Sequence, residues 1–251
     1  SLIEMPGMIA KLSSPDELVR LEAAEKFNDY SYFGQAEVIA ALQSRLGDEN
    51  PAVRRAALET LRNIAPRNLA TINAVLSALA SEKNMDVRKE AVRTLGQIAT
   101  YALESEAAPL VEIYFQTDDE GMRSVVVEAL INMGFVNDRV IDVLAAAKSF
   151  DGLKKLGAGN ARAMTALAEL ARSSDWSVYF YALEALGDFE RGEADATQAL
   201  GILHEIYKSD TDKYGKRRQQ IMIAAKHVGV GNAAATGIFI DGLDDAVGDV
   251  V

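Results

Sequence analysis

A fourteen-residue segment recurs, in altered form, along most of this 251-residue chain. Its clearest copy spans residues 51–64, with the sequence PAVRRAALETLRNI, and it follows Asp48, Glu49 and Asn50. Acceptor side chains followed by proline are typical of a helix start, because proline has no N–H group to leave unbonded in the first turn. Apolar residues then recur at spacings of four, four and three: Val53, Ala57, Leu61 and Ile64. The segment therefore predicts an amphipathic helix, which Pro66 ends.

A valine or methionine followed by arginine marks the same position in four copies. These pairs are Val19-Arg20, Val53-Arg54, Val87-Arg88 and Met122-Arg123, spaced by 34, 34 and 35 residues. A fifth copy places Val178 at this position, and a weaker sixth begins at Arg217. A period in the thirties with two helical patterns per unit is typical of helical solenoids. We predict an all-α fold, a right-handed α-solenoid of about six to seven two-helix repeats, one of them degenerate.

The repeats divide the chain into stretches that we expect to form a single domain over residues 1–251. They are regular repeats 1–133, a degenerate repeat 134–159, repeats 160–230 and a C-terminal cap 231–251. The expected helices are 1–14, 16–29, 35–46, 52–65, 69–81, 85–100, 104–116, 120–133, 138–149, 160–172, 175–189, 194–208 and 214–228, with a short one near 233–240. Residues 150–159 are too few and too rich in glycine for a full partner helix. We interpret this defect as a deletion, with a bend or a site as the alternatives.

Composition excludes several classes of protein. The net charge of −11 argues against a surface that binds nucleic acid, because such surfaces need clustered positive charge. No run of about 18 apolar residues is present, so we expect no membrane span. The chain has no cysteine, which excludes disulfides and thiolate chemistry. We expect a cytoplasmic protein, with the periplasm left open.

The predicted second helices resemble those of HEAT repeats. The residues that carry the resemblance are Asp16 with Val19-Arg20, the segment from Asn50 to Arg54, and Asp86-Val87-Arg88. The short period and the motif ALEALG at 182–187 are similar to the short bacterial branch named for phycobilisome lyase subunits. The resemblance covers about residues 8–228, although 134–160 do not keep the period. It implies an α-solenoid, in a branch that includes bilin lyase subunits, phycobilisome-handling factors and bacterial scaffold or adaptor proteins.

The most regular polar feature is a column of arginines: Arg20, Arg54, Arg88 and Arg123. Each follows an apolar position and lies near acidic or asparagine residues at its own helix start or its neighbour's. We expect a structural ladder in which these arginines join repeats by charge-assisted hydrogen bonds. An anion-binding groove is the alternative. On the ladder interpretation, Arg54→Ala or Arg88→Ala lowers stability more than partner binding.

A second column lies six residues after each valine or methionine. Its members are Glu25, Glu59, Arg93, Glu128 and Glu184. On a helix whose apolar stripe faces inward, these side chains face out, toward the concave side of a HEAT-like stack. The column is mostly acidic, which suits either a solvated face or a groove for a basic segment of a partner. Arg55, Lys89 and Phe180 form a parallel column, two residues after the marker position.

The densest aromatic cluster runs from Trp176 to Tyr181 and contains the only tryptophan. Successive helical residues are about 100° apart, so Tyr179, Phe180 and Tyr181 cannot all point inward. Aromatic side chains at a surface favour contacts with a protein or a ring-shaped ligand. Core packing with one exposed ring is the alternative. Phe180 is the ring that we place on the groove.

Catalytic and metal-binding patterns are weak. His204-Glu205 is a single pair and His227 stands alone, so we expect no metal site, cofactor or catalytic triad. We therefore predict a non-enzymatic scaffold or adaptor that binds another protein through a basic or aromatic-recognising segment. Its expected contact residues are Arg55, Glu59, Lys89, Arg93, Glu128, Tyr179, Phe180 and Glu184. The alternative that the resemblance implies is a bilin lyase subunit or chromophore-handling factor, whose groove holds an open-chain tetrapyrrole.

Overall fold

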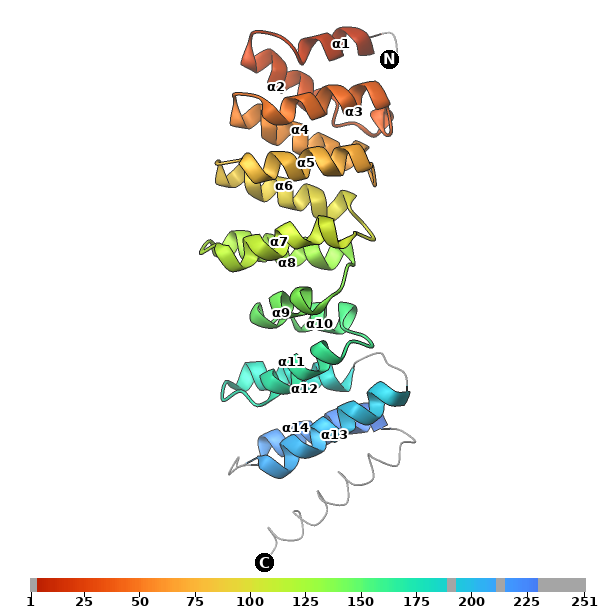
Figure 1. Ribbon diagram of the computed structural model, residues 1–251, viewed down its shortest axis with the longest axis vertical. Coiled ribbons are helices and arrows are strands. Elements are labelled where there is room, and N and C mark those ends of the chain that lie inside the picture. The colour runs from red at the N-terminus through yellow and green to blue at the C-terminus, as the bar shows by residue number, and fades with distance from the viewer. Residues whose placement is uncertain (1–3, 189–192, 211–214, 230–251) are drawn as a thin grey trace, which may run out of the picture. The chain divides into compact units, whose positions relative to one another are not determined.

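A computed structural model describes residues 4–188, 193–210 and 215–229, and all regular secondary structure in these ranges is helical (Figure 1). The α-helices are α1 (Met5–Lys11), α2 (Glu17–Lys26), α3 (Ala36–Gln43), α4 (Pro51–Ile64), α5 (Leu69–Ser81), α6 (Met85–Ile98), α7 (Glu104–Gln116), α8 (Glu120–Met133), α9 (Asp138–Ala146), α10 (Phe150–Leu156), α11 (Ala161–Ala171), α12 (Trp176–Gly187), α13 (Glu193–Ser209) and α14 (Lys216–Gly229). Two 3-10 helices, Tyr30–Tyr32 and Ser44–Gly47, flank α3. None of the described helices is long and apolar enough to cross a membrane.

The chain divides into two compact units, residues 1–135 and 136–251. In the first unit, α1 with α2, α3 with α4, α5 with α6 and α7 with α8 pack as successive helix pairs (Figure 1). The second helices α2, α4, α6 and α8 pack in a row, and α3, α5 and α7 form the other layer. The prediction of an α-solenoid built from helix pairs is confirmed. The prediction of one domain over the whole chain stays a prediction.

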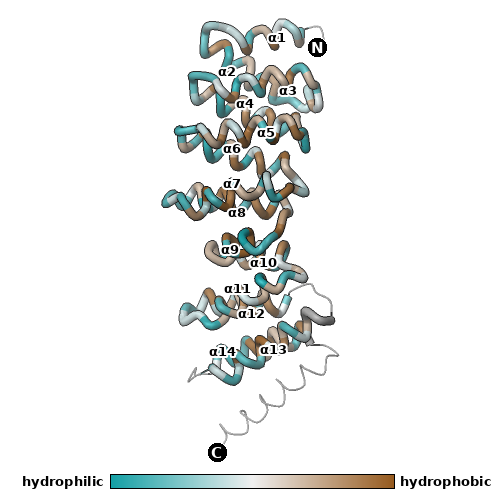
Figure 2. The backbone as a smooth tube through the Cα atoms, viewed as in Figure 1, coloured by the Kyte–Doolittle hydropathy of each residue, from teal (hydrophilic) through white to brown (hydrophobic). Residues whose placement is uncertain are grey.

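Five of the second helices begin where the sequence places a capping side chain. Asp16, Asn50, Asn84, Asp119 and Asp175 are the N-caps of α2, α4, α6, α8 and α12, and each accepts a hydrogen bond from a backbone N–H of the first turn. The apolar stripe of α4 is fully buried at Val53, Ala57, Leu61 and Ile64. Figure 2 shows hydrophobic and hydrophilic stretches alternating along the helices. The pattern in the sequence therefore identifies both the helix starts and the core.

Backbone hydrogen bonds tie each repeat of the first unit to the next. The N–H groups of Gly34, Arg67 and Ala102 donate to the last carbonyls of α4, α6 and α8, at 2.8, 2.9 and 3.1 Å. These donors lie in the loops that lead into the next first helix. The helix ends are thus bonded to a neighbouring loop, which satisfies carbonyls that a helix cannot bond itself.

The second unit contains the irregular repeat. The sequence predicts no full partner helix after α9, and the structure places the seven-residue α10 there. This short helix packs against α9 and α12, and its Leu153 is fully buried. Beyond it, α11 pairs with α12 and α13 with α14.

Most predicted helices agree with the structure to within a few residues. The helix expected over 35–46 ends at Gln43, and a 3-10 turn over Ser44–Gly47 leads into the next helix. The helix expected near 233–240 lies outside the described residues.

Candidate functional site

The second helices carry the residues that the sequence selects, and their packing depends on close contact between small side chains. A Cβ atom added at Gly96 of α6 would lie 2.6 Å from the Cα of Ala129 in α8. A Cβ atom at Gly187 of α12 would lie 3.1 Å from the Cα of Ala224 in α14. The absence of a side chain at these glycines allows the paired helices to approach closely.

Two of the four arginines in the predicted ladder join neighbouring repeats. Arg20 binds both carboxylate oxygens of Asp48, with Nε–Oδ2 and Nη2–Oδ1 distances of 2.8 and 3.0 Å. Arg54 binds Glu82 in the same way, with Nε–Oε2 and Nη2–Oε1 distances of 2.6 and 2.8 Å. Paired hydrogen bonds between a guanidinium and a carboxylate are strong and fix the orientation of both groups. Arg20 and Arg54 therefore have the geometry expected of a structural ladder.

The carboxylates that pair with Arg20 and Arg54 are held in their charged form. Burial raises the pKa of Glu82, but hydrogen bonds from Arg54 and from the backbone of Asn84 outweigh it, and the pKa is lowered. The same balance lowers the pKa of Asp48, where Arg20 supplies the main hydrogen bond. Both carboxylates therefore remain charged and bound at neutral pH.

The other two arginines of the column do not join repeats within the first unit. Arg123 contacts Glu120 of its own helix at 3.0 Å and lies over the ring of Tyr114. The guanidinium of Arg88 makes no hydrogen bond or ion pair with the residues that the structure describes, and its buried Nε has no partner. The geometry at Arg88 therefore differs from that at Arg20 and Arg54, and a stabilising role for Arg88 stays a prediction. Asp48 pairs with Arg20 and Glu82 pairs with Arg54, but no acid among the described residues of the following repeat pairs with Arg88.

The outward columns of the first unit consist largely of internal ion pairs. Arg55 and Glu59 pair along α4, with 3.1 Å between Nε and Oε1. Lys89 of α6 reaches Asp119, the N-cap of α8, at 2.8 Å. Three of the predicted contact residues thus already have partners inside the protein, and Lys89 also joins two repeats.

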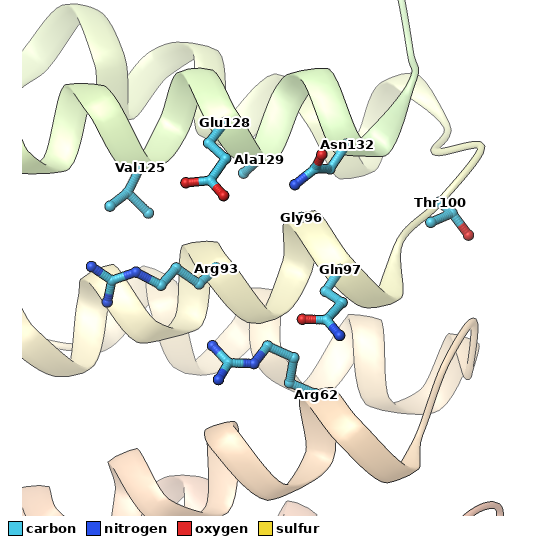
Figure 3. Close-up of a pocket in the computed structure, with 9 residues that line it drawn as sticks. All are labelled: Arg62, Arg93, Gly96, Gln97, Thr100, Val125, Glu128, Ala129 and Asn132. Atoms are coloured by element: carbon cyan, nitrogen blue, oxygen red, sulfur yellow. The ribbon is translucent and has the colours of Figure 1, made fainter.

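Arg93 and Glu128 lie together at a pocket that crosses three second helices. The pocket has a volume of about 350 Å³ and is lined by Arg62 of α4, by Arg93, Gly96 and Gln97 of α6, by Thr100, and by Val125, Glu128, Ala129 and Asn132 of α8 (Figure 3). Gly96 and Ala129, where α6 and α8 are in close contact, also line it. The pocket offers cationic, anionic and amide groups side by side, so it can both donate and accept hydrogen bonds.

A buried carboxylate holds the two arginines of this pocket. Glu90 of α6 is 5% exposed and accepts from Arg62 at 2.5 Å and from Arg93 at 3.4 Å. Burial raises the pKa of Glu90, and the neighbouring arginines offset this only in part. Glu128 is exposed and has no partner among the described residues. The free charge at this pocket is therefore the carboxylate of Glu128, together with the unused donors of the two arginines.

The aromatic cluster of the second unit forms a continuous strip on α12 and α10. Trp176 stacks on Phe180 with 5.0 Å between ring centroids, Phe180 meets Tyr181 edge to face, and Tyr181 lies beside Phe150. Trp176 and Tyr181 are 57% and 48% exposed. These two side chains are exposed to solvent, and the ring of the half-buried Phe180 packs against both of them.

One predicted contact residue, Tyr179, lies outside this exposed aromatic strip. Tyr179 is only 6% exposed, and the guanidinium of Arg217 covers its ring at 4.3 Å. Its role in a partner contact is not supported. Glu184, by contrast, is exposed and lines a second pocket of about 350 Å³ with Phe150, Tyr181 and Lys154.

Several residues of these sites were not selected from the sequence. Arg62, Gln97, Asn132 and Phe150 were missed, and Trp176 was named only as part of the cluster. Asn63, Gln97 and Asn132 recur at intervals of 34 and 35 residues, ten positions after the marker valine or methionine. This spacing was the available signal. Arg62 and Phe150 do not recur, so no periodic signal could have found them.

Within the described ranges, no group of three or more His, Asp or Glu side chains is arranged to hold a metal ion. His204-Glu205 lies in α13, and His227 lies in α14, 3.7 Å from Asp188. The sequence also places Lys213, Lys216, Arg217, Arg218 and Lys226 close together near the C-terminal end, and Lys213 lies outside the described residues. Arg217 and Arg218 bond to the backbone oxygens of Ser173 and Asp210.

The successive helix pairs and the row of second helices define the chain as a helical repeat protein of the α-solenoid class. HEAT repeats are matched over residues 5–71 and 72–151. The chain belongs to the HEAT-repeat family.

Solved structures match the chain at low sequence identity. The complex of CpcE and CpcF of phycocyanin lyase from Nostoc is 20% identical, with 88% of this chain and 92% of that chain covered and a TM-score of 0.48. A designed armadillo repeat protein in complex with the peptide (KR)4 is 20% identical, with 90% and 100% covered and a TM-score of 0.44. An engineered protein is 20% identical, with 94% and 70% covered and a TM-score of 0.47. A search of curated proteins finds no match.

Proposed function

We propose that this protein is a non-enzymatic scaffold that binds another protein on the exposed face of its second helices. The observation that carries the proposal is the pocket between Arg93 and Glu128 (Figure 3), because it crosses three repeats. Donors, acceptors and charges of both signs along one groove suit a polypeptide, whose backbone needs both donors and acceptors. A preformed surface of this kind acts by binding, without any chemical step.

The charges that remain unpaired favour a basic segment of the partner. Apart from Arg88, each described cation of α4, α6 and α8 has an acidic partner inside the protein. Glu25 of α2 and Glu128 of α8 have none among the described residues. A lysine or arginine of the partner would gain an ion pair there, whereas an acidic side chain would face like charge.

The second unit offers an aromatic contact. Trp176 and Tyr181 are large and exposed, and Tyr181 lines the pocket that also contains Phe150 and Lys154. Tryptophan and tyrosine are common among the residues that dominate binding energy at protein interfaces. We place the aromatic-recognising contact on these two side chains, with Phe180 as their support.

The bilin lyase hypothesis, which the sequence resemblance raises, makes a different prediction. An open-chain tetrapyrrole held in a groove gives a shifted and sharpened visible absorption band when mixed with the protein. Under the scaffold proposal, no such band forms, and a protein partner from the native source binds without a bilin.

The scaffold proposal is tested by the affinity of a partner isolated from the native source for two variants and one control. Glu128→Lys and Tyr181→Ala should each weaken binding by about tenfold, equivalent to about 1.4 kcal/mol, without a matching fall in Tm. Asn73→Lys, at an exposed position of the first-helix layer in α5, should bind as the wild type does. Unchanged affinity in both second-helix variants would overturn the proposal.

A further inference from the structure

The two occupied rungs of the arginine ladder show what this position requires. The Nη1 group of Arg20 donates to the carbonyls of Ser14 and Pro15, and that of Arg54 donates to the carbonyls of Asp48 and Glu49. The remaining donors of each guanidinium bind a carboxylate of the next repeat, Asp48 or Glu82. A guanidinium in this position is therefore bonded on one side by its own turn and on the other by an acid.

The acid comes from the same place in each turn between the helices of a repeat. Asp48 accepts from the N–H of Asn50 at 3.0 Å, and Glu82 accepts from the N–H of Asn84 at 2.8 Å. At the next turn, Thr117 accepts from the N–H of Asp119 at 3.2 Å. Thr117 therefore occupies the position of the rung acid, but it has no carboxylate to offer Arg88.

The nearby carboxylates of the turn do not take over this role. Asp119 is bound to Lys89 at 2.8 Å, and Glu120 is bound to Arg123 at 3.0 Å. Asp118 is fully exposed and lies 3.9 Å from Arg123. Arg88 keeps a buried Nε with no acceptor, which is unusual because nearly all buried donors in proteins are bonded.

We propose that Arg88 is a binding site for a carboxylate supplied from outside the chain, the side chain of an aspartate or glutamate on a protein partner. The carboxylate takes the place that Asp48 and Glu82 fill at the preceding steps, and it completes the third rung. The site lies beside the turns between the helices of a repeat. It is separate from the pocket of Figure 3, so it stands or falls independently of binding there.

Acetate serves as the probe, and thermal unfolding is measured in sodium acetate and in sodium chloride at matched ionic strength and near-neutral pH. Acetate at about 0.3 M should raise the Tm of the wild type by about 1–3 °C over chloride, because it binds the folded state alone. Thr117→Asp supplies the missing carboxylate internally. It should raise the Tm in chloride and abolish the difference between acetate and chloride. Arg88→Met should also abolish the difference in Tm between acetate and chloride, but it should not raise the Tm in chloride.

Equal acetate effects in all three proteins would show a general salt effect and overturn the proposal, and so would the absence of an effect in the wild type. A Thr117→Asp variant that does not gain stability would also count against it. A clear fall in Tm for Asp118→Asn in chloride would show that Asp118 fills the site in solution, which equally overturns it.

A second measurement needs no variant to be stable. In an NMR titration of the wild type with acetate, the Nε–Hε signal of Arg88 should shift, whereas those of Arg20 and Arg54 should not, because their carboxylates are already in place. Equal shifts of all three signals, or none at Arg88, would exclude a specific site.

Discussion

Arg54 and Arg88 occupy equivalent positions in consecutive repeats, yet only Arg54 has a partner. The fork between Arg54 and Glu82 is mostly buried, with side chains 16% and 8% exposed. Breaking a buried ion pair leaves one charge without compensation, which is strongly destabilising. The equivalence of the two positions in the sequence therefore does not carry over to their energetic roles.

Arg54→Ala should lower the free energy of unfolding by about 3 kcal/mol, because it leaves the buried carboxylate of Glu82 without its partner. Arg88→Ala, its matched control, should change it by less than about 1 kcal/mol in chloride buffer, because no bond is lost. Chemical denaturation of both variants measures the difference. Equal losses would contradict the geometry of the ladder.

The lowered pKa of Glu82 gives the ladder a dependence on pH. Its folded-state pKa lies below its ordinary value of 4.5, so the stabilisation is fully present above that pH and is lost as the pH falls through the lower value. Glu82→Gln should therefore reduce the slope of unfolding free energy against pH in the acid range. Glu128→Gln is the control, because its carboxylate has no bond to lose. An unchanged slope in Glu82→Gln would rule out this contribution.

Single residues also show where prediction from sequence ends. The arginine column is predicted by its spacing, but whether a rung forms depends on a second residue about 28 positions later, an acid at 48 and 82 and threonine at 117. Tyr179 and Tyr181 are two positions apart on one helix. Their exposure differs because Arg217, from a segment distant in sequence, covers Tyr179.

At the scale of the helix, capping residues and apolar periodicity define the ends of some helices, whereas packing against neighbouring helices defines the ends of others. The start of α4 and the full extents of α5, α7 and α8 follow from capping residues and apolar periodicity, so they could be predicted. The short α10 could not, because glycines at 152, 157 and 159 do not indicate how many residues remain helical. Tertiary packing of Leu153 decides the outcome.

The contact between α6 and α8 leaves no room for a methyl group. Gly96→Ala would place a Cβ atom 2.6 Å from the backbone of Ala129, so the helices must separate, and stability should fall by about 2–3 kcal/mol. Gly201→Ala is the control, because Gly201 lies in α13 with no atom within 4 Å of its added Cβ. It should gain up to about 1 kcal/mol from helix propensity. Thermal or chemical unfolding compares the two, and a loss at Gly201 as large as at Gly96 would contradict this account.

For the whole molecule, the repeat period predicts the fold but gives little information about the partner. The same buried positions recur in each copy, whereas the outward positions vary, and binding depends on the latter. The pocket of Figure 3 combines residues that the sequence separates by up to 70 positions, from Arg62 to Asn132. Only two of its residues, Arg93 and Glu128, belong to the predicted contact set. Their meeting follows from the stacking of α4, α6 and α8.

The central claim is that the partner binds the second helices, and site-specific photo-crosslinking tests it most directly. A photoreactive amino acid at Gln97 of α6, which lines the pocket, is compared with one at Asn73 of α5, which is exposed in the other layer. In extracts of the native source, illumination should join one partner protein to the Gln97 variant and leave the Asn73 variant free. Crosslinks to that partner from Asn73, with none from Gln97, would contradict the claim.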